Sequence, residues 1–276
     1  MIGLTEKLTI LHYDGATYSD YSDILLSYLS EDVSISLAPT DKFYVGFKKP
    51  INTVFVEVHT AHNIDTTLSV KYYNGAAFDD VLGLLDDSGS FDHSGFIQWD
   101  RNQDSESKTA IDGVEQFWYE LTVADSITKT LDGLNIVFSD DNDLKLECFE
   151  ITDYYPEGRH SHILSHVASR NFIIQKLRTD GRYKLDLSNG NLKDITAFDL
   201  LDVSQVRMAS TFLTLSKIFT NLSDESEDVY SQKATHYMSL FGEVMQHFFL
   251  YLDTDDDGTL DTDERTMNVS SVLVRR

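Results

Sequence analysis

Short runs in which apolar and polar residues alternate fill the chain up to about residue 155. Glycine, asparagine, aspartate and serine separate the runs, a pattern typical of antiparallel sheets with one buried face. We expect strands at residues 8–13, 33–37, 43–47, 53–59, 68–73, 96–100, 116–123, 135–138 and 144–151. The Asn74-Gly75 pair predicts a tight hairpin turn, because such turns need positive φ at their central residues. Helical spacing over residues 18–30 predicts one short helix within this region.

After residue 155 the apolar positions take on helical spacing. A first helix is expected over 161–177 and a short strand over 183–187. Two wide apolar stripes, over 206–222 and 230–252, predict a pair of longer helices. The short loop between them makes an antiparallel helix hairpin, with Asp224 or Ser226 as the N-cap of the second helix.

The change of period predicts an α+β protein with two domains. Residues 1–155 are expected to form an acidic, antiparallel β-sandwich of jelly-roll-like type. Residues 156–276 are expected to form a helical assembly or connector domain with the helix hairpin, a calcium loop and a terminal strand.

Charge and composition narrow the function classes. Of the formal net charge of −24, the first 155 residues carry −19 and the remainder −5. This balance argues against nucleic-acid binding, which needs clustered lysine and arginine. Residues 1–15 hold no basic region followed by an apolar run, and no eighteen apolar residues stand together, so the sequence predicts neither secretion nor a membrane span.

The sharpest motif is the twelve-residue stretch 253–264, DTDDDGTLDTDE, which fits a calcium loop at each required position. The expected ligands are the side chains of Asp253, Asp255 and Asp257, the carbonyl of Thr259, Asp261 directly or through water, and both oxygens of Glu264. So many carboxylates repel one another unless a cation holds them, which favours a bound Ca²⁺ or Mg²⁺. The alternative is a solvated acidic turn that only mimics the pattern.

The surroundings of this loop differ from those of an EF-hand, the family that the loop resembles. An EF-hand has a helix on each side, whereas residues 267–274 have the pattern of a strand. We therefore expect a static structural clip between a helix end and a terminal strand, and no calcium switch.

Other candidate chemistry is weaker. His160, His162 and His166 have a spacing that can hold zinc, but neither a glutamate nor cysteines accompany them, so they are interpreted as a surface or interface helix start. Cys148 is expected to be a buried thiol. Alternation places Trp118 on the face opposite Phe117 and Tyr119, which favours core and interface roles over sugar stacking.

Catalytic patterns are missing from the sequence. It contains no nucleophile elbow, phosphate loop, dinucleotide-binding glycine triad or cysteine with a positioned histidine. Acid pairs such as Asp79-Asp80 are expected by chance in loops of so acidic a region. The sequence therefore predicts a protein that is not an enzyme, with a hydrolase as a minor alternative.

Three strand motifs carry a resemblance: VKYYNGAAFDDV at 70–81, GFIQWD at 95–100 and FWYELTV at 117–123. Over residues 50–151 the chain resembles a β-sandwich that recurs in virion proteins of tailed bacteriophages. The helical part with its acidic turn near the end is similar to neck or head–tail connector proteins, which dock beneath the portal ring.

The resemblance implies a virion structural subunit, assembled in the host cytoplasm as a homo-oligomeric ring of sixfold or twelvefold symmetry that contacts the portal and other neck and tail proteins. The apolar strand at 269–274 would pair with a neighbour's sheet edge or with this chain's own sheet. A tail or baseplate subunit is the nearest alternative. A calcium-dependent carbohydrate-binding module for host adhesion is the alternative from another class.

Overall fold

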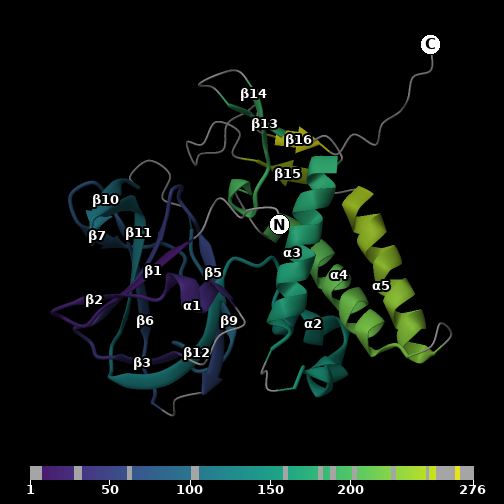
Figure 1. The fold of residues 1–276 in the computed structure, drawn as a ribbon, viewed down its shortest axis with the longest axis horizontal. Helices are drawn as coiled ribbons and strands as arrows, with labels where there is room; N and C mark the ends of the chain where they lie inside the picture. Colours follow the sequence, from purple (N-terminus) through teal and green to yellow (C-terminus); the bar gives the residue numbers. More distant parts are fainter. Residues whose placement is uncertain are drawn as a thin grey trace. The chain divides into compact units, whose positions relative to one another are not determined.

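The computed structural model describes residues 8–27, 33–60, 64–100, 106–157, 161–179, 183–186, 191–200, 204–224, 228–246, 249–252 and 265–267. It is a mixed α+β structure in which antiparallel sheets precede helices, as the sequence predicts (Figure 1). The chain forms two compact units. We call Met1–Ile136 with Tyr155–Ser161 the sheet unit, and Val137–Tyr154 with His162–Arg276 the helical unit.

The first sheet of the sheet unit has seven strands in the order β2-β1-β4-β11-β6-β7, with β10 also paired to β11. Its strands are β1 Thr9–Tyr13, β2 Tyr18–Asp20, β4 Lys42–Phe47, β6 Leu68–Tyr73, β7 Phe78–Asp80, β10 Lys108–Ile111 and β11 Val114–Val123. The predicted Asn74-Gly75 hairpin joins β6 and β7, with Gly75 at φ +95°.

The second sheet has five strands in the order β3-β12-β5-β9-β8. These are β3 Val33–Leu37, β5 Thr53–Thr60, β8 Leu85–Asp86, β9 Gly95–Gln98 and β12 Ile127–Asn135, and the short helix α1 Ser22–Ser27 lies in the same unit. Side chains of the two sheets meet in the core, where the rings of Trp99 and Tyr119 lie 4.9 Å apart. Alternate residues of β4, such as Phe43 and Val45, are fully buried on this inner side.

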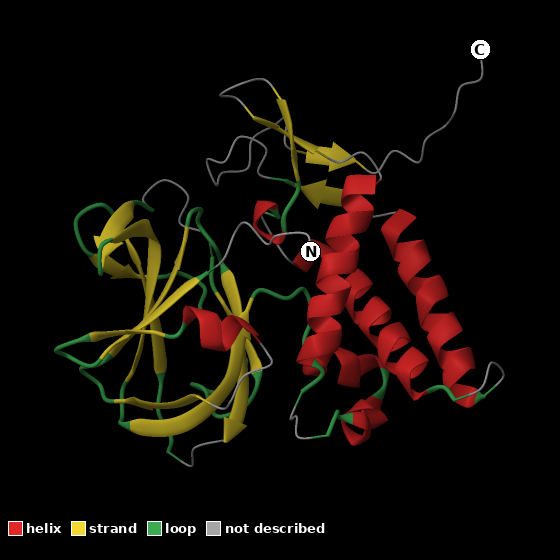
Figure 2. Cartoon of the chain, in the orientation of Figure 1, coloured by secondary structure: helices red, strands yellow, loops and turns green. Residues whose placement is uncertain are grey.

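The helical unit contains α2 Asp141–Glu147, the 3-10 segments η1 Phe149–Tyr154 and η2 Ala197–Asp199, and the helices α3 Ile163–Thr179, α4 Ser204–Leu222 and α5 Val229–Gln246. Two small hairpins accompany them: β13 Tyr183–Asp186 with β14 Asn191–Asp194, and β15 Phe249–Tyr251 with β16 Arg265–Met267. Figure 2 separates these helices from the strands by colour. The predicted α4–α5 hairpin is confirmed; Phe219 of α4 stacks on Tyr237 of α5 at 5.8 Å.

Two strand predictions are wrong. The strand expected at 144–151 is α2 and η1, because Asp140 and Asp143 form a capping box that starts a helix. These elements belong to the helical unit, although the sequence prediction divided the chain after residue 155. Of the strand expected at 135–138, only Asn135 is in a strand: it ends β12, and residues 136–138 are not extended in a sheet. Buried Lys129 and Asp132 hid the apolar pattern of β12 itself.

Helix ends also differ from the predictions. Residues 18–30 form the strand β2 followed by α1, and Asp20 Oδ1 accepts from the Ser22 backbone N–H at 2.8 Å. Helix α5 is capped by Asp228, whose Oδ1 accepts from the Ser231 N–H at 2.6 Å. Asp224, one of the two residues expected to cap it, instead donates its N–H to Asp228. No helix in the described part of the chain has the length and apolarity needed to cross a membrane.

Candidate functional site

The six expected calcium ligands, Asp253, Asp255, Asp257, Thr259, Asp261 and Glu264, lie outside the described residues. The two strands that flank these residues, β15 and β16, are described. Strands β15 and β16 pair antiparallel, and the Cα atoms of Tyr251 and Arg265, on the two sides of the acidic loop, lie about 5 Å apart. The loop is thus the connection of a β-hairpin.

This hairpin corrects the expectation that a helix runs directly into the loop. Helix α5 ends at Gln246, and β15 intervenes. Its anchor to the helices is firm: Leu250 and Leu252 are buried, Leu252 bridges to Leu200, and the Tyr251 N–H donates to Gln205 Oε1 at 2.6 Å. The strand expected at 269–274 lies outside the described residues.

The histidines form a different site from the one expected. His160 lies outside the described residues, whereas His162 and His166 are fully buried at the start of α3. The interpretation as a surface helix start is therefore wrong for these two side chains. His162 Nε2 lies 3.0 Å from the Ile151 carbonyl oxygen, and the His162 N–H donates to the Asp141 carboxylate at 3.2 Å.

His166 is the centre of a hydrogen-bonded network. Its Nε2 lies 3.0 Å from Asp141 Oδ1, and its Nδ1 lies 3.0 Å from Ser139 Oγ. The Ser139 hydroxyl in turn lies 2.7 Å from the Ser210 hydroxyl of α4. The network therefore ties the starts of α2 and α3 to the middle of α4.

The charges at this network shift several pKa values. Burial raises the pKa of Asp141, but the hydrogen bond and charge of His166 outweigh it and leave that pKa below its usual value. Burial lowers the pKa of His162. Burial and the neighbouring Asp143 carboxylate raise the pKa of Asp140 to about 6.

Asp141, His166 and Ser139 have the connectivity of a catalytic triad, in which an acid orients a histidine that contacts a hydroxyl. The His166 and Ser139 side chains have no exposed surface, and the Ser139 hydroxyl is already bonded to Ser210. A substrate cannot reach the hydroxyl, so the arrangement holds helices together. Among the described residues, no group of three or more histidine, cysteine or acidic side chains is placed to hold a metal.

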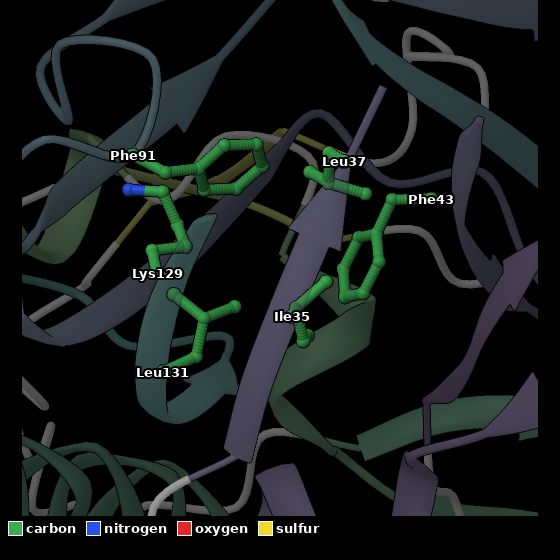
Figure 3. Close-up of a pocket in the computed structure, with 6 residues that line it drawn as sticks. All are labelled: Ile35, Leu37, Phe43, Phe91, Lys129 and Leu131. Atoms are coloured by element: carbon green, nitrogen blue, oxygen red, sulfur yellow. The ribbon is translucent and has the colours of Figure 1, made fainter. Parts of the chain in front are cut away.

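A hollow in the sheet unit is the other enclosed candidate. Figure 3 shows it, lined by Ile35, Leu37, Phe43, Phe91, Lys129 and Leu131. The space between these side chains admits no water molecule, so it is a packing gap and holds no ligand. The Lys129 side chain extends toward Phe91, and its Nζ lies 5.9 Å from the ring centroid.

Two apolar side chains of the helical unit are strongly exposed. Phe149 is 90% exposed and Leu146 is 85% exposed, although Leu144 and Ile151 on the same segment are fully buried. Cys148, which lies between Leu146 and Phe149 in the sequence, is the buried thiol that the sequence predicts, and burial raises its pKa. The chain therefore holds this segment firmly while presenting Phe149 and Leu146 to solvent.

Part of the buried network could be predicted from the sequence. The capping box of Asp140 and Asp143 predicts a helix start that brings Asp141 into play. The pairing of Asp141 with His166, 25 residues later in the chain, has no local signal.

Comparison with protein-family models, with curated proteins and with solved structures finds no match for this chain.

Proposed function

We propose that this protein is a structural subunit of a tailed bacteriophage particle, a neck or head–tail connector protein that forms a ring on the portal and is not an enzyme. In this proposal the two sheets are the jelly-roll-like β-sandwich that the motifs at 70–81, 95–100 and 117–123 resemble. A tail or baseplate position is the nearest alternative.

The observation that carries the assembly role is the exposure of Phe149 and Leu146. We place these two side chains in a subunit contact, because a neighbour that covered them would remove their apolar surface from water. The segment is rigid because its neighbours lock it to α5: Lys233 pairs with Glu150, and the Tyr237 hydroxyl donates to the Glu147 carbonyl oxygen at 3.3 Å. A contact on this segment would therefore be transmitted directly to the helix hairpin.

Calcium has a structural part in the proposal. The β15–β16 pair brings together the strands on the two sides of the acidic loop, and α4 holds β15 through Gln205. A cation bound by Asp253, Asp255, Asp257, Thr259, Asp261 and Glu264 would neutralise the loop and fix the direction of the chain beyond β16.

The assembly proposal is tested by negative-stain imaging and light scattering of the purified protein, alone and mixed with the candidate portal. We expect rings or portal-bound caps for the wild type and their loss in the double variant Phe149→Ser, Leu146→Ser. The matched control is Leu82→Ser, which removes a side chain 63% exposed in the sheet unit. A wild type that stays monomeric and ignores the portal refutes the connector role and favours a tail-tip position.

The calcium proposal is tested by titration calorimetry and thermal unfolding with Ca²⁺, with Mg²⁺ and with chelator. Glu264→Gln removes the bidentate ligand and is expected to weaken Ca²⁺ binding by tenfold or more, on the order of 1.4 kcal/mol. Asp263→Asn removes a carboxylate that stands at no ligand position of the calcium-loop pattern and is expected to bind nearly as the wild type does. Absence of heat and of thermal stabilisation at millimolar Ca²⁺ would refute the clip.

A further inference from the structure

An aromatic row crosses the outer side of the first sheet. Each strand along the path β2-β1-β4-β11-β6-β7 contributes one ring. In strand order the rings are Tyr18, Tyr13, Tyr44, Trp118, Tyr73 and Phe78. We call these six residues the aromatic face. The rings gather around Tyr44, which lies 6.4 Å from Tyr18 and 5.9 Å from Phe78, the two ends of this order.

Each ring of the aromatic face contacts at least one other ring of the face. Ring centroids lie 4.7 Å apart for Tyr13 and Tyr18, 6.4 Å for Tyr18 and Tyr44, and 5.9 Å for Tyr44 and Phe78. Tyr73 continues the row beyond Phe78 at 5.5 Å, and Trp118 meets Tyr44 edge-on at 6.2 Å.

The aromatic face is directed away from the core between the sheets. Tyr44 lies between Phe43 and Val45 in β4, whose side chains point inward, and it clusters instead with Leu11, Ile111 and Trp118. Tyr44 and Trp118 are buried at the floor of the row. Tyr18 is 39% exposed, and the other outer rings are only partly buried, so aromatic surface remains open to solvent at both sheet edges.

A buried carboxylate lies in the centre of this face. Glu120 is opposite Tyr44 in the sheet and only 4% exposed. Its Oε2 accepts from the Tyr44 hydroxyl at 3.0 Å and from Lys42 Nζ at 2.8 Å. Its Oε1 accepts no hydrogen bond from any residue that the structure describes. This oxygen keeps its lone pairs free, so a ligand hydroxyl placed beside it would find an acceptor.

These groups have the chemistry that recognises sugars. The C–H faces of a pyranose stack on aromatic rings, while neighbouring hydroxyls donate to a carboxylate and accept from an ammonium group. Lys42 can supply the ammonium group, because its side chain is 39% exposed and has protons left after the bond to Glu120. The charge of −19 on the first 155 residues repels uronic and sialic acids, so the ligand is an uncharged polysaccharide.

We propose that the aromatic face binds a neutral polysaccharide, with sugar rings stacked on Tyr18 and Phe78 and a hydroxyl pair held by Glu120 and Lys42. This site does not depend on the connector role, because it uses neither Phe149 nor the acidic loop. A particle subunit of either kind could carry it.

The test is affinity electrophoresis of the full chain in gels that contain dextran, mannan or a soluble β-glucan, with hyaluronan as the acidic comparator. We expect retardation by at least one neutral polysaccharide and none by hyaluronan. Tyr18→Ala and Phe78→Ala each remove a stacking ring and are expected to weaken binding by about tenfold. Tyr18→Phe keeps the ring and is expected to keep the binding.

Glu120→Gln keeps the shape of the side chain but loses the carboxylate charge, and it is expected to weaken binding by a similar factor. Leu85→Ala, which truncates a side chain 63% exposed on the second sheet, is the matched control and is expected to bind as the wild type does. Circular dichroism checks that each variant is folded.

The proposal is overturned if none of the three neutral polysaccharides retards the wild type, or if Tyr18→Ala, Phe78→Ala and Glu120→Gln are retarded as strongly as the wild type. It is also overturned if light scattering shows that Phe78→Ala turns an oligomer into a monomer. In that case a second copy of the chain covers the aromatic face. Loss of rings on the portal without loss of retardation would refute only the connector role.

Discussion

Two buried polar groups, one in each unit, differ in how their polar atoms are satisfied. In the helical unit, Asp141, His166, Ser139 and Ser210 are buried as one network in which each side chain has a partner. In the sheet unit, Lys129 is only 2% exposed, and its Nζ has no hydrogen-bond partner among the residues that the structure describes. Both groups are buried, so they differ only in whether their polar atoms have hydrogen-bond partners. A satisfied network stabilises, and an unsatisfied charge destabilises.

The polar network also explains how α4 packs. Further along this helix, the Thr214 hydroxyl donates to Ser169 Oγ of α3 at 2.9 Å, and the Ser216 hydroxyl donates to the Ala234 carbonyl oxygen of α5 at 2.9 Å. These bonds are directional, unlike apolar contacts. They fix which residues of α4 face α3 and α5, and therefore the register of the helices.

The largest effect is expected from Asp141→Ala. This change removes the acceptor of both His166 Nε2 and the His162 N–H, and it leaves two buried donors without partners. We expect the free energy of unfolding to fall by about 3 kcal/mol. Urea unfolding followed by the helical circular dichroism signal measures it.

Asp141 also makes stability depend on pH. Its folded pKa is below its unfolded value, so its contribution is present above about pH 4 and is lost as the pH falls through the folded pKa. Asp141→Asn should remove this dependence while keeping one acceptor. Asp153→Ala, which truncates an exposed acid in η1, is the control and should change stability by less than about 0.5 kcal/mol. An Asp141→Ala protein as stable as the control would contradict the network's role.

The next effect has the opposite sign and belongs to the sheet unit. Lys129→Met removes the buried amine but keeps an unbranched apolar chain of similar length. Burial lowers the pKa of Lys129 to about 8, so below that pH the wild type buries a charge at a cost. We expect the variant to be more stable at pH 7 by about 2 to 3 kcal/mol.

The sign of the stability change in Lys129→Met can be checked by measuring unfolding at several pH values. Because the folded pKa of Lys129 lies below its unfolded value near 10.5, wild-type stability from this group rises between about pH 8 and pH 10.5. The advantage of Lys129→Met should therefore shrink over that range. Subtracting the wild-type curve cancels the other titrating groups, and a variant that is less stable at pH 7 would show that Phe91 stabilises the ammonium group more than burial penalises it.

The sequence predicted elements where one local pattern dominated. The strand at 33–37, the hairpin at Asn74-Gly75 and the helices α3 and α4 follow directly from alternation, turn chemistry and helical spacing. Secondary-structure prediction from the sequence was wrong where tertiary contacts or a helix cap outweighed the local apolar pattern. Lys129 interrupts a buried strand, and the alternation at 144–151 concealed a helix whose cap was the stronger signal.

The candidate sites were predicted less completely, for the same reason. The acidic loop is readable because its residues are contiguous, whereas the aromatic face combines residues from four separate parts of the chain: the β1–β2 hairpin, β4, the β6–β7 hairpin and β11. Only strand order and register reveal that Tyr18 and Phe78 lie over the same sheet face. The buried network likewise depends on a contact between Ser139 and Ser210 that spans 71 residues.

The smallest effects come from two glycines, one in each unit. A Cβ added at Gly46 of β4 would lie 2.5 Å from the Trp118 ring and 2.5 Å from Gln116 Oε1, whereas a Cβ at Gly242 of α5 meets nothing within 4 Å. Gly46→Ala is therefore expected to destabilise by about 2 kcal/mol through overpacking against Trp118 at the floor of the aromatic face. Gly242→Ala is expected to stabilise by about 0.5 to 1 kcal/mol, because alanine is the better helix former.

Measured side by side in urea, the two glycine substitutions separate packing from propensity. Gly46→Ala should also weaken retardation by the neutral polysaccharide that binds, because Trp118 has to shift beneath the outer rings, while Gly242→Ala should leave retardation unchanged. If both substitutions stabilise, the close approach of Trp118 to the β4 backbone is absent in solution, and the floor of the aromatic face is looser than its geometry indicates. If Gly46→Ala destabilises without affecting retardation, the sugars contact only the outer rings, Tyr18 and Phe78, and Trp118 serves the fold alone.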